Sequence, residues 1–236
     1  MINLKRANGI LLHISSLPGS YGIGEIGPEA FTFVDDLVEM GQTLWQILPD
    51  NPTDEYHCPY SATSAFANNP MLISLDNLIR DGWLNLNDVK SYPRTNFEKV
   101  DYPRFEKFKQ DLLTKAAANF EETKKDNQKF DFENYCEKNQ YWLNDYALFC
   151  TIQNFLGEQQ WIKWPKSFRT HQISAIEDVI EEHRDKINKI KIIQYLYDVQ
   201  WKELKNYANS KGIKIIGDIP IYVSYNSVDV WINQNL

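Results

Sequence analysis

Three segments combine acid, hydroxyl and aromatic side chains directly after short apolar runs: residues 13–18, 50–60 and 218–222. In parallel βα folds the reactive groups lie on loops beyond the carboxyl ends of the strands, so chemistry is expected at such segments. Aromatic rings beside hydrogen-bonding acids suit sugars, which present apolar C–H faces and hydroxyl edges. The pattern also leaves open that Asp218 caps the following turn and that Tyr60 fills a corner of the core.

A glycine pattern in the same region suggests different chemistry. Gly22, Gly24 and Gly27 spell G-x-G-x-x-G between an apolar run and a helical segment, as in a dinucleotide site. Such a site needs the first glycine at the end of the strand, where the chain turns into the helix whose N-terminus holds the pyrophosphate. Here residues 15–21 intervene, and Glu25 would place a carboxylate inside the phosphate cradle. The pattern favours a glycine-rich surface loop, with a nucleotide-binding α/β protein as an alternative.

The cysteines and histidines do not form a metal-binding pattern. Cys58 follows His57 directly, but no partner pair stands at ligand spacing, so we expect no metal and no cofactor. The three cysteines are odd in number and include no C-x-x-C pair, which predicts free thiols in a reducing compartment. Cys136 and Cys150 lie on helical segments, where they are expected to be buried small hydrophobes. His13, inside an apolar run, is expected to be a hydrogen-bonded core residue.

Four further aromatic and histidine positions lie in helical surroundings. His171 and His183 are expected to face solvent. Trp161 and Trp164 could offer a platform for a sugar ring, but packing is the more frequent use of such residues.

The elements that must position the first groups alternate between strand and helix. Residues 9–14 and 43–48 are short apolar runs bounded by turn formers, which predicts buried parallel strands. Between them, Pro28 is placed for the first turn of a helix and Gly41 for its end. Residues 51–70 form a long loop, and a loop of this length without regular structure is usually functional.

The rest of the chain is expected to be a helical insertion followed by a return to the βα pattern. Residues 76–183 contain charged helical segments, such as 105–120 and 132–155, and no clear strand. A helix that stops at Gly212 and a strand over 213–216 complete the plan β–α–β, insertion, α–β.

Composition excludes several classes of protein. The chain has 236 residues, of which 43% are hydrophobic, and this predicts one or two globular domains instead of a disordered or collagen-like chain. Its net charge of −7 argues against a nucleic-acid partner. No apolar run approaches the roughly 20 residues that cross a bilayer, and the first six residues lack the apolar part of a signal peptide. We therefore expect a cytoplasmic protein without a membrane partner.

Several long motifs resemble the 4-α-glucanotransferases (amylomaltase or disproportionating enzyme family), N-terminal portion only. They are Gly9-Ile-Leu-Leu-His13, Ser16-Leu-Pro-Gly19, Tyr21-Gly-Ile-Gly-Glu-Ile-Gly-Pro-Glu29, Trp45-Gln-Ile-Leu-Pro49, Pro59-Tyr-Ser61, Ser64-Ala-Phe-Ala67, Asn69-Pro70, Lys211-Gly-Ile-Lys-Ile-Ile-Gly-Asp-Ile-Pro-Ile-Tyr-Val223, Ser227 and Asp229-Val-Trp231. The resemblance covers nearly the whole chain from Gly9 onward.

This resemblance implies an α/β fold: about three βα units from the N-terminal part of a TIM (β/α)8 barrel, with a helical subdomain between strands 2 and 3. Residues 1–75 would hold the first two strands and the long loop, 76–190 the inserted subdomain, and 191–236 a helix and the third strand. It also implies retaining transfer of α-1,4-glucan segments from a maltodextrin donor to a glucose or maltodextrin acceptor. The oligomeric state stays open.

The resemblance assigns substrate-binding roles to four residues. Tyr60 matches a tyrosine that stacks near the scissile sugar, and Asp218 matches an aspartate that supports the site at the end of the third strand. Cys58 stands where the family usually has serine, and a thiol is a poorer hydrogen-bond donor. Tyr56 lies near a position that serves a secondary glucan site in some members.

No catalytic residue of the family is present, because its nucleophile, general acid and third carboxylate follow later strands and would lie beyond Leu236. A barrel needs about 250 residues before insertions, and subtracting the insertion leaves enough for three βα units. We therefore expect a truncated chain that is inactive alone. The alternative from another class is a standalone glucan-binding or pseudoenzyme module.

Overall fold

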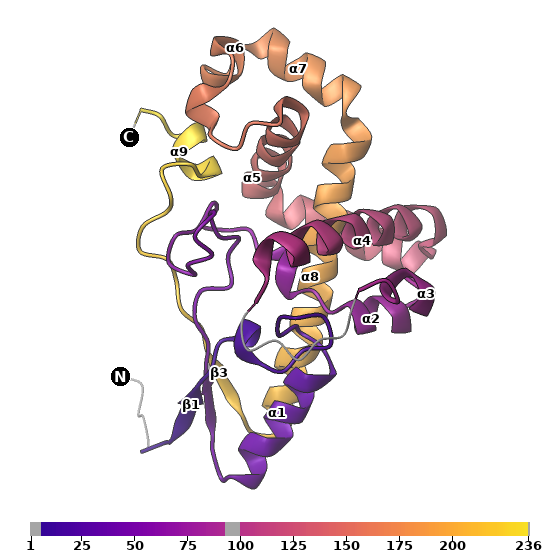
Figure 1. Cartoon of the computed structure of the whole chain (residues 1–236), viewed down its shortest axis with the longest axis vertical. Coiled ribbons are helices and arrows are strands. Elements are labelled where there is room, and N and C mark those ends of the chain that lie inside the picture. The colour runs from indigo at the N-terminus through magenta and orange to yellow at the C-terminus, as the bar shows by residue number, and fades with distance from the viewer. Residues whose placement is uncertain (1–5, 93–99, 236) are drawn as a thin grey trace. The chain divides into compact units, whose positions relative to one another are not determined.

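The computed structural model describes residues 6–92 and 100–235 (Figure 1). The prediction that the first six residues lack the apolar part of a signal peptide concerns mainly residues 1–5, which lie outside the described residues. Residues 93–99 of the predicted insertion and Leu236 also lie outside them. The strands are β1 (Gly9–Leu11), β2 (Leu44–Gln46) and β3 (Lys214–Ile216). The helices are α1 (Pro28–Glu39), α2 (Leu75–Arg80), α3 (Leu86–Val89), α4 (Tyr102–Thr123), α5 (Asp126–Leu156), α6 (Lys166–Arg169), α7 (Ile173–Glu182), α8 (Arg184–Ser210) and α9 (Val228–Ile232), with 3-10 turns at Ile14–Ser16, Pro70–Leu72 and Trp161–Lys163.

The chain forms two compact units, and two of the boundaries between them fall inside α4 and α8. The first unit comprises residues 1–50, 70–119 and 196–219, and the second comprises 51–69, 120–195 and 220–236. Among the described residues, all three strands belong to the first unit, while α5, α6 and α7 belong wholly to the second.

The sheet of the first unit is parallel, with strand order β1-β2-β3. Gly9 pairs with Leu44, which in turn pairs with Lys214. The close approach explains the glycine, since a Cβ at position 9 would lie 2.5 Å from the Leu44 Cβ. The strand–helix order predicted from the sequence is confirmed, and parallel pairing brings the carboxyl ends of all three strands to one edge of the sheet.

The strands are shorter than the apolar runs predict. After β1 the chain turns into a 3-10 turn, closed by a hydrogen bond from Ser16 N to His13 O at 2.9 Å. Pro49 follows β2 as expected, but the ladder already ends at Gln46.

The prediction of buried strands is also wrong for two of them: Trp45 of β2 is fully buried, but Leu11 of β1 is 55% exposed and Ile216 of β3 is 41% exposed. Pairing partners, and not apolar composition, decide where each strand ends.

Helix α1 forms where its sequence signals predict. Pro28 occupies the first turn, Val34 and Leu37 are buried, and Gly41 adopts a positive φ of 68° just beyond the helix. Trp45 of β2 is fully buried beside this helix. Its ring meets the Phe33 ring edge-on at 5.0 Å between centroids.

A buried ion pair crosses the interior of the first unit. Lys109 of α4 donates to the Glu25 carboxylate and to the Ile73 carbonyl, and both charged side chains are buried. Leu75 N adds a third bond to Glu25, at 3.0 Å. Burial raises the pKa of Glu25 and lowers the pKa of Lys109, while the attraction between the two charges opposes both shifts.

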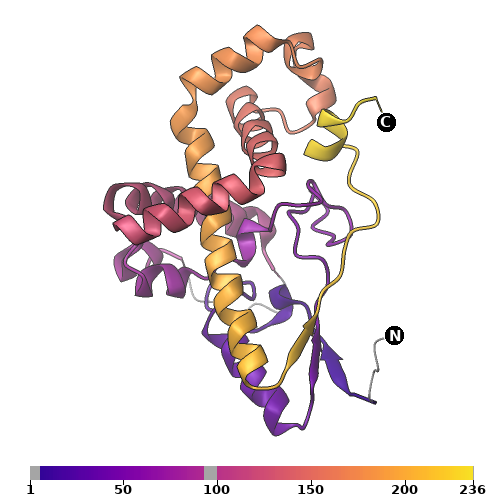
Figure 2. The ribbon, with the colours of Figure 1, turned by 180° about the vertical axis from the view of Figure 1, so that it is seen from behind.

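The second unit is held together by aromatic side chains. Phe120, Phe132 and Tyr195 pack ring to ring with centroids 5.5–5.9 Å apart. Trp164 and Trp231 pack edge to face at 5.6 Å, and Trp231 Nε1 donates to a carbonyl of α6, so α9 lies beside α6 in both views (Figures 1 and 2). Trp161 and Trp164 are both buried, which agrees with packing and leaves neither as an open platform.

The solvent-facing prediction for two histidines is wrong. His171 and His183 each have a buried Nε2 without a hydrogen-bond partner among the described residues. The His171 ring packs edge-on against Trp231 at 4.3 Å, and the His183 ring packs against Phe155 at 4.9 Å. Their helical surroundings did not reveal these aromatic neighbours, because the rings come from distant segments of the sequence.

Two cysteines on α5 are less buried than predicted. Cys136 and Cys150 are half-buried as residues, and all three cysteines are free thiols. Burial nevertheless raises the pKa of the Cys150 thiol to about 12, so it remains protonated at neutral pH.

Candidate functional site

One candidate site, in the first unit, is the carboxyl edge of the sheet. His13 follows β1, Asp50 follows β2, and Asp218 follows β3. Because the strands are parallel and in register, these three residues leave the sheet at the same edge. This is the edge at which parallel βα folds place their reactive groups.

Asp50 is held by Tyr197 of α8, whose hydroxyl donates to the carboxylate. Burial and the neighbouring Asp50 charge raise the pKa of Tyr197 well above its ordinary value, so the hydroxyl keeps its proton. The pair therefore fixes one acceptor at this edge.

His13 is buried, but its Nδ1 has no hydrogen-bond partner among the described residues. Burial lowers its pKa, and the charge of Asp50 partly opposes that shift. The ring is thus a neutral imidazole at pH 7. The prediction that His13 is a buried residue is confirmed, but the prediction that it is hydrogen-bonded is wrong for Nδ1.

A separate candidate site is a hairpin within the long loop, in the second unit. An isolated antiparallel bridge joins Thr53 to Ala62. Asp54 N donates to Ser61 O at 3.0 Å, and the Ser61 hydroxyl donates to the Asp54 carboxylate. The predicted functional loop therefore has a defined shape although the described structure places no helix or longer strand in it.

Three of the four predicted substrate-binding residues lie on this hairpin. The Tyr56 side chain is 78% exposed and the Tyr60 side chain 48% exposed, and Cys58 is an exposed thiol. The alternative in which Tyr60 fills a core corner is wrong at this exposure. His57 adopts a positive φ of 54° between Tyr56 and Cys58, which turns the hairpin at its tip.

The fourth residue, Asp218, belongs to the first unit. It is half-buried, and its Oδ1 accepts a hydrogen bond from Ile219 N at 2.8 Å. That bond is the local turn contact expected of an aspartate leaving a strand. The structure therefore groups Tyr56, Cys58 and Tyr60 on one hairpin and places Asp218 at the sheet edge with His13 and Asp50.

The sequence analysis named the segment 218–222, whose Tyr222 is exposed, but it missed three other exposed aromatic residues of the second unit: Tyr225, Phe66 of the loop and Tyr141 of α5. A signal for Tyr225 was present, because it closely follows that segment. Phe66 and Tyr141 had no such signal, since both fit an ordinary apolar pattern.

The glycine pattern does not form a phosphate cradle. A Cβ at Gly24 would lie 2.0 Å from Ile14 O, and one at Gly27 would lie 2.5 Å from Ser74 Oγ, so protein atoms already fill the space beside both glycines. The carboxylate of Glu25 is buried in its ion pair. These glycines permit close packing of the loop, and they offer no room for a pyrophosphate.

Metal and membrane sites receive no support from the described residues. His57 and Cys58 belong to no group of three or more metal-ligating side chains within 6–92 and 100–235. Across the same residues, no helix is long and apolar enough to span a bilayer.

The fold and these sites define an α/β protein with a small parallel sheet, whose strand ends and loops present acids and exposed aromatic rings. A family model described as 4-alpha-glucanotransferase matches residues 12–236, and the chain belongs to this family. It is 40% identical over 234 residues to a 4-alpha-glucanotransferase of Streptococcus pneumoniae and 37% identical over 234 residues to one of Aquifex aeolicus. A chloroplastic/amyloplastic 4-alpha-glucanotransferase of Solanum tuberosum is 39% identical over 238 residues.

A solved structure gives the same assignment. The amylomaltase of Streptococcus agalactiae in complex with acarbose superposes with a TM-score of 0.89 at 38% identity, covering 98% of this chain and 47% of that one. The three relatives are covered over 41–46% of their length. The chain thus spans less than half the length of the curated relatives it matches.

Proposed function

We propose that this chain forms the N-terminal part of a 4-α-glucanotransferase and takes part in transferring α-1,4-glucan segments between maltodextrins. The observation that carries the proposal is the hairpin over 53–62, which displays Tyr56, Cys58 and Tyr60 together. Family membership over residues 12–236 supports it, and so does the similarity to an amylomaltase crystallised with acarbose.

The architecture we propose is about three βα units of a (β/α)8 barrel, with a helical subdomain between the second and third strands. Residues 1–75 would supply two strands and the hairpin loop, 76–190 the subdomain, and 191–236 the third strand. The parallel β1-β2-β3 sheet and the long helical segment between β2 and β3 support this assignment.

Each proposed site residue has a chemical role. The Tyr60 ring would stack on the apolar face of the glucose unit next to the bond that is cleaved, and Tyr56 would contact a more distant unit. Cys58 would approach a sugar hydroxyl, as a weaker donor than serine. Asp218 would support the site from the end of β3 by accepting a hydrogen bond.

The reaction would be a retaining double displacement. One carboxylate attacks the anomeric carbon to form a glycosyl-enzyme intermediate, while a carboxylic acid protonates the leaving oxygen and later deprotonates the acceptor hydroxyl. We assign neither role to a residue of this chain, because no stretch of it matches the family motifs that carry them. We therefore propose that the isolated chain is inactive.

A chimera tests the proposal. The chain is fused to the part of the Streptococcus pneumoniae relative that follows its aligned region, and the product is incubated with maltotriose. We expect longer and shorter maltodextrins to form, and replacement of Tyr60 by alanine to lower kcat/KM by about 10- to 100-fold through loss of one stacked ring.

The matched control is Phe130→Ala, which removes an exposed ring far along the chain from the hairpin. Tyr60→Phe keeps the ring and should retain most of the activity. A folded chimera that leaves maltotriose unchanged would contradict the transferase assignment.

A standalone glucan-binding module is the second candidate, because the hairpin that presents the rings is closed by its own hydrogen bonds. In that case the isolated chain would unfold cooperatively, and its Tm would rise with added maltodextrin. Absence of such a shift, together with an active chimera, would reject the module.

A further inference from the structure

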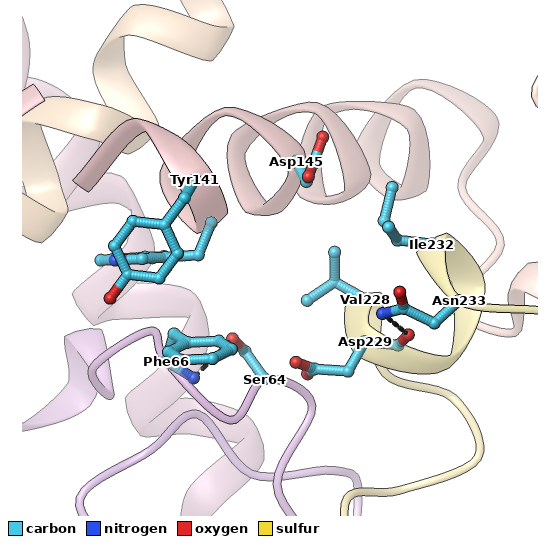
Figure 3. Close-up of a pocket in the computed structure, with 9 residues that line it drawn as sticks. Ser64, Phe66, Tyr141, Asp145, Val228, Asp229, Ile232 and Asn233 are labelled. Atoms are coloured by element: carbon cyan, nitrogen blue, oxygen red, sulfur yellow. Dashed lines mark hydrogen bonds between the residues drawn. The ribbon is translucent and has the colours of Figure 1, made fainter. Parts of the chain in front are cut away.

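A pocket lies wholly within the second unit (Figure 3). It has a volume of about 150 Å³. Its lining comes from the loop over 51–69, from α5, and from α9 with the residue that follows it: Ser64, Phe66, Tyr141, Trp142, Asp145, Val228, Asp229, Ile232 and Asn233.

One end of the pocket is aromatic. The Phe66 and Tyr141 rings meet edge to face with centroids 5.6 Å apart, and both lie at the same end of the pocket in Figure 3. Phe66 is 51% exposed and Tyr141 is 65% exposed, so a large part of each ring remains uncovered by the protein. Two large rings left open beside a pocket provide an apolar surface against which a ligand can lie.

The other side carries oxygen atoms that can accept hydrogen bonds. The half-buried Asp145 carboxylate receives no hydrogen bond from the residues that the structure describes. Burial raises its pKa, and the charge of His171 partly opposes that shift. A carboxylate that is partly removed from water without a donor is a group that a ligand hydroxyl would satisfy.

The remaining polar groups are already oriented. Asp229 Oδ2 accepts from Ala65 N at 2.9 Å, which leaves its Oδ1 for a ligand. Asn233 Nδ2 donates to Asp229 O at 2.8 Å, as the dashed line in Figure 3 marks, so the free side of this amide is its acceptor oxygen. Ser64 Oγ accepts from Phe66 N and Ala67 N, and both bonds hold the loop that presents the Phe66 ring.

We propose that this pocket binds a single glucose unit, as a carbohydrate site separate from the hairpin. A pyranose ring offers several hydroxyl donors to the acceptors at Asp145, Asp229 and Asn233, and an apolar face to the rings of Phe66 and Tyr141. The volume is below the roughly 300–1,000 Å³ of pockets that hold drug-sized ligands, which limits the ligand to about one ring. The choice of glucose rests on the proposed function.

A metal ion fits this pocket less well. It would leave the aromatic end unused, and no group of three or more metal-ligating side chains occurs among the described residues. An organic ammonium ion could satisfy the carboxylates and the rings together, so it is included as a competing probe.

The test measures binding of D-glucose to the full chain by saturation-transfer NMR and titration calorimetry, with ethylammonium chloride as the second probe. The variants are Tyr141→Ala and Asp145→Asn. Each has a matched control on α5: Phe130→Ala, whose ring is 67% exposed, and Asp131→Asn, which is also exposed. Circular dichroism and Tm verify that each variant is folded.

We expect wild-type chain to bind glucose with a millimolar Kd, and each pocket variant to weaken binding at least about 10-fold. Both controls should bind glucose as the wild type does. Unchanged binding in folded Tyr141→Ala and Asp145→Asn would overturn the proposal, as would no binding of glucose by the wild type. Binding of ethylammonium but not glucose, lost in Asp145→Asn, would overturn it in favour of a cation site.

This result is separable from the proposed function. If glucose binding depends on Tyr141 while the chimera is inactive on maltotriose, the pocket stands and the transferase assignment fails. If the chimera is active and glucose binding is unchanged in Tyr141→Ala, the transferase assignment stands and the proposed pocket fails.

Discussion

The two units of the molecule differ in whether their acidic side chains are paired and their aromatic rings are exposed. In the first unit, Glu25 is neutralised by Lys109, and Asp50 accepts from Tyr197. In the second unit, the Asp145 carboxylate has no donor within the described residues, and the rings of Tyr56 and Tyr141 are exposed. These two acids of the first unit are paired within it, while the second unit leaves an acid without a donor from the described residues and two rings exposed.

This difference separates structural polar groups from groups available for binding. A buried polar group must be hydrogen-bonded or it costs free energy, so the closed pairs of the first unit are requirements of its packing. Exposed rings and a carboxylate without a donor add little to the stability of the fold. Their stacking and hydrogen-bonding interactions remain to be made with a ligand. Substitutions in the two units should therefore affect different measurements.

The largest effect is expected at the buried ion pair. Lys109→Met leaves the Glu25 charge buried without its partner, and we expect a loss of about 3–5 kcal/mol in the free energy of unfolding, measured by urea denaturation. Lys107→Met, at an exposed position of the same helix, is the control and should change stability by less than about 0.5 kcal/mol.

The double variant Glu25→Gln/Lys109→Met removes both charges and should recover part of that loss. Equal stability of Lys109→Met and the control would show that the ion pair is not a requirement of the packing.

The next largest effect is expected in the glycine loop of the first unit. A methyl group at Gly24 must displace Ile14 O, so Gly24→Ala should cost about 1–3 kcal/mol, read from the urea midpoint. Gly217→Ala is matched to it, because nothing lies within 4 Å of its added Cβ, and it should be close to neutral. If both variants are neutral, the loop is not closely packed, and the nucleotide alternative reopens.

In the second unit, the expected effect moves from stability to binding. Tyr60→Ala in the chimera should raise the KM for maltotriose about 10-fold, because it removes one stacking ring. Its free energy of unfolding should fall far less than that of Lys109→Met. A large loss of stability with unchanged KM would remove the contrast between the units.

The smallest effect is a pH dependence at the sheet edge. Burial holds the folded-state pKa of His13 below its ordinary value of 6.5, so the unfolded chain takes up the proton first as the pH falls. The contribution of His13 to stability is therefore present above about pH 6.5 and is lost as the pH falls through and below it.

His13→Gln should reduce the loss of stability between pH 7 and pH 5, measured by urea titrations at each pH. Gln159→Asn, at an exposed position without a titratable side chain, is the control and should preserve the wild-type slope. An unchanged slope in His13→Gln would show that the imidazole is not held neutral by burial.

Much of the fold was predictable because its signals are local. The start of α1 at Pro28 and the glycine beyond its end follow from backbone geometry, and the absence of a strand among the described residues between β2 and β3 follows from the spacing of apolar residues. Motif resemblance gave the family. The four substrate-binding residues stay predictions, since the structure gives their location and exposure only.

The failures share a physical cause. The predicted strands were too long because pairing partners, and not the apolar run itself, end a strand. His171 and His183 were expected to face solvent because Trp231 and Phe155, which cover their rings, are remote in sequence. The pocket between α5 and α9 had no sequence signal, because Phe66, Tyr141 and Asp229 come from three distant segments.

The sequence by itself determined the family, the order of strands and helices, and the loop that carries Tyr56, Cys58 and Tyr60, because these depend on residues close together along the chain. Only the tertiary structure decided which polar side chains are paired within the protein and which remain without a hydrogen-bond partner among the described residues. Glu25 precedes Ile26 and Asp145 precedes Tyr146, so nothing in the sequence beside either acid predicts whether it is paired. Folding supplies Lys109 to one and no donor from the described residues to the other, because a hydrogen-bond partner 84 positions away is set by packing alone.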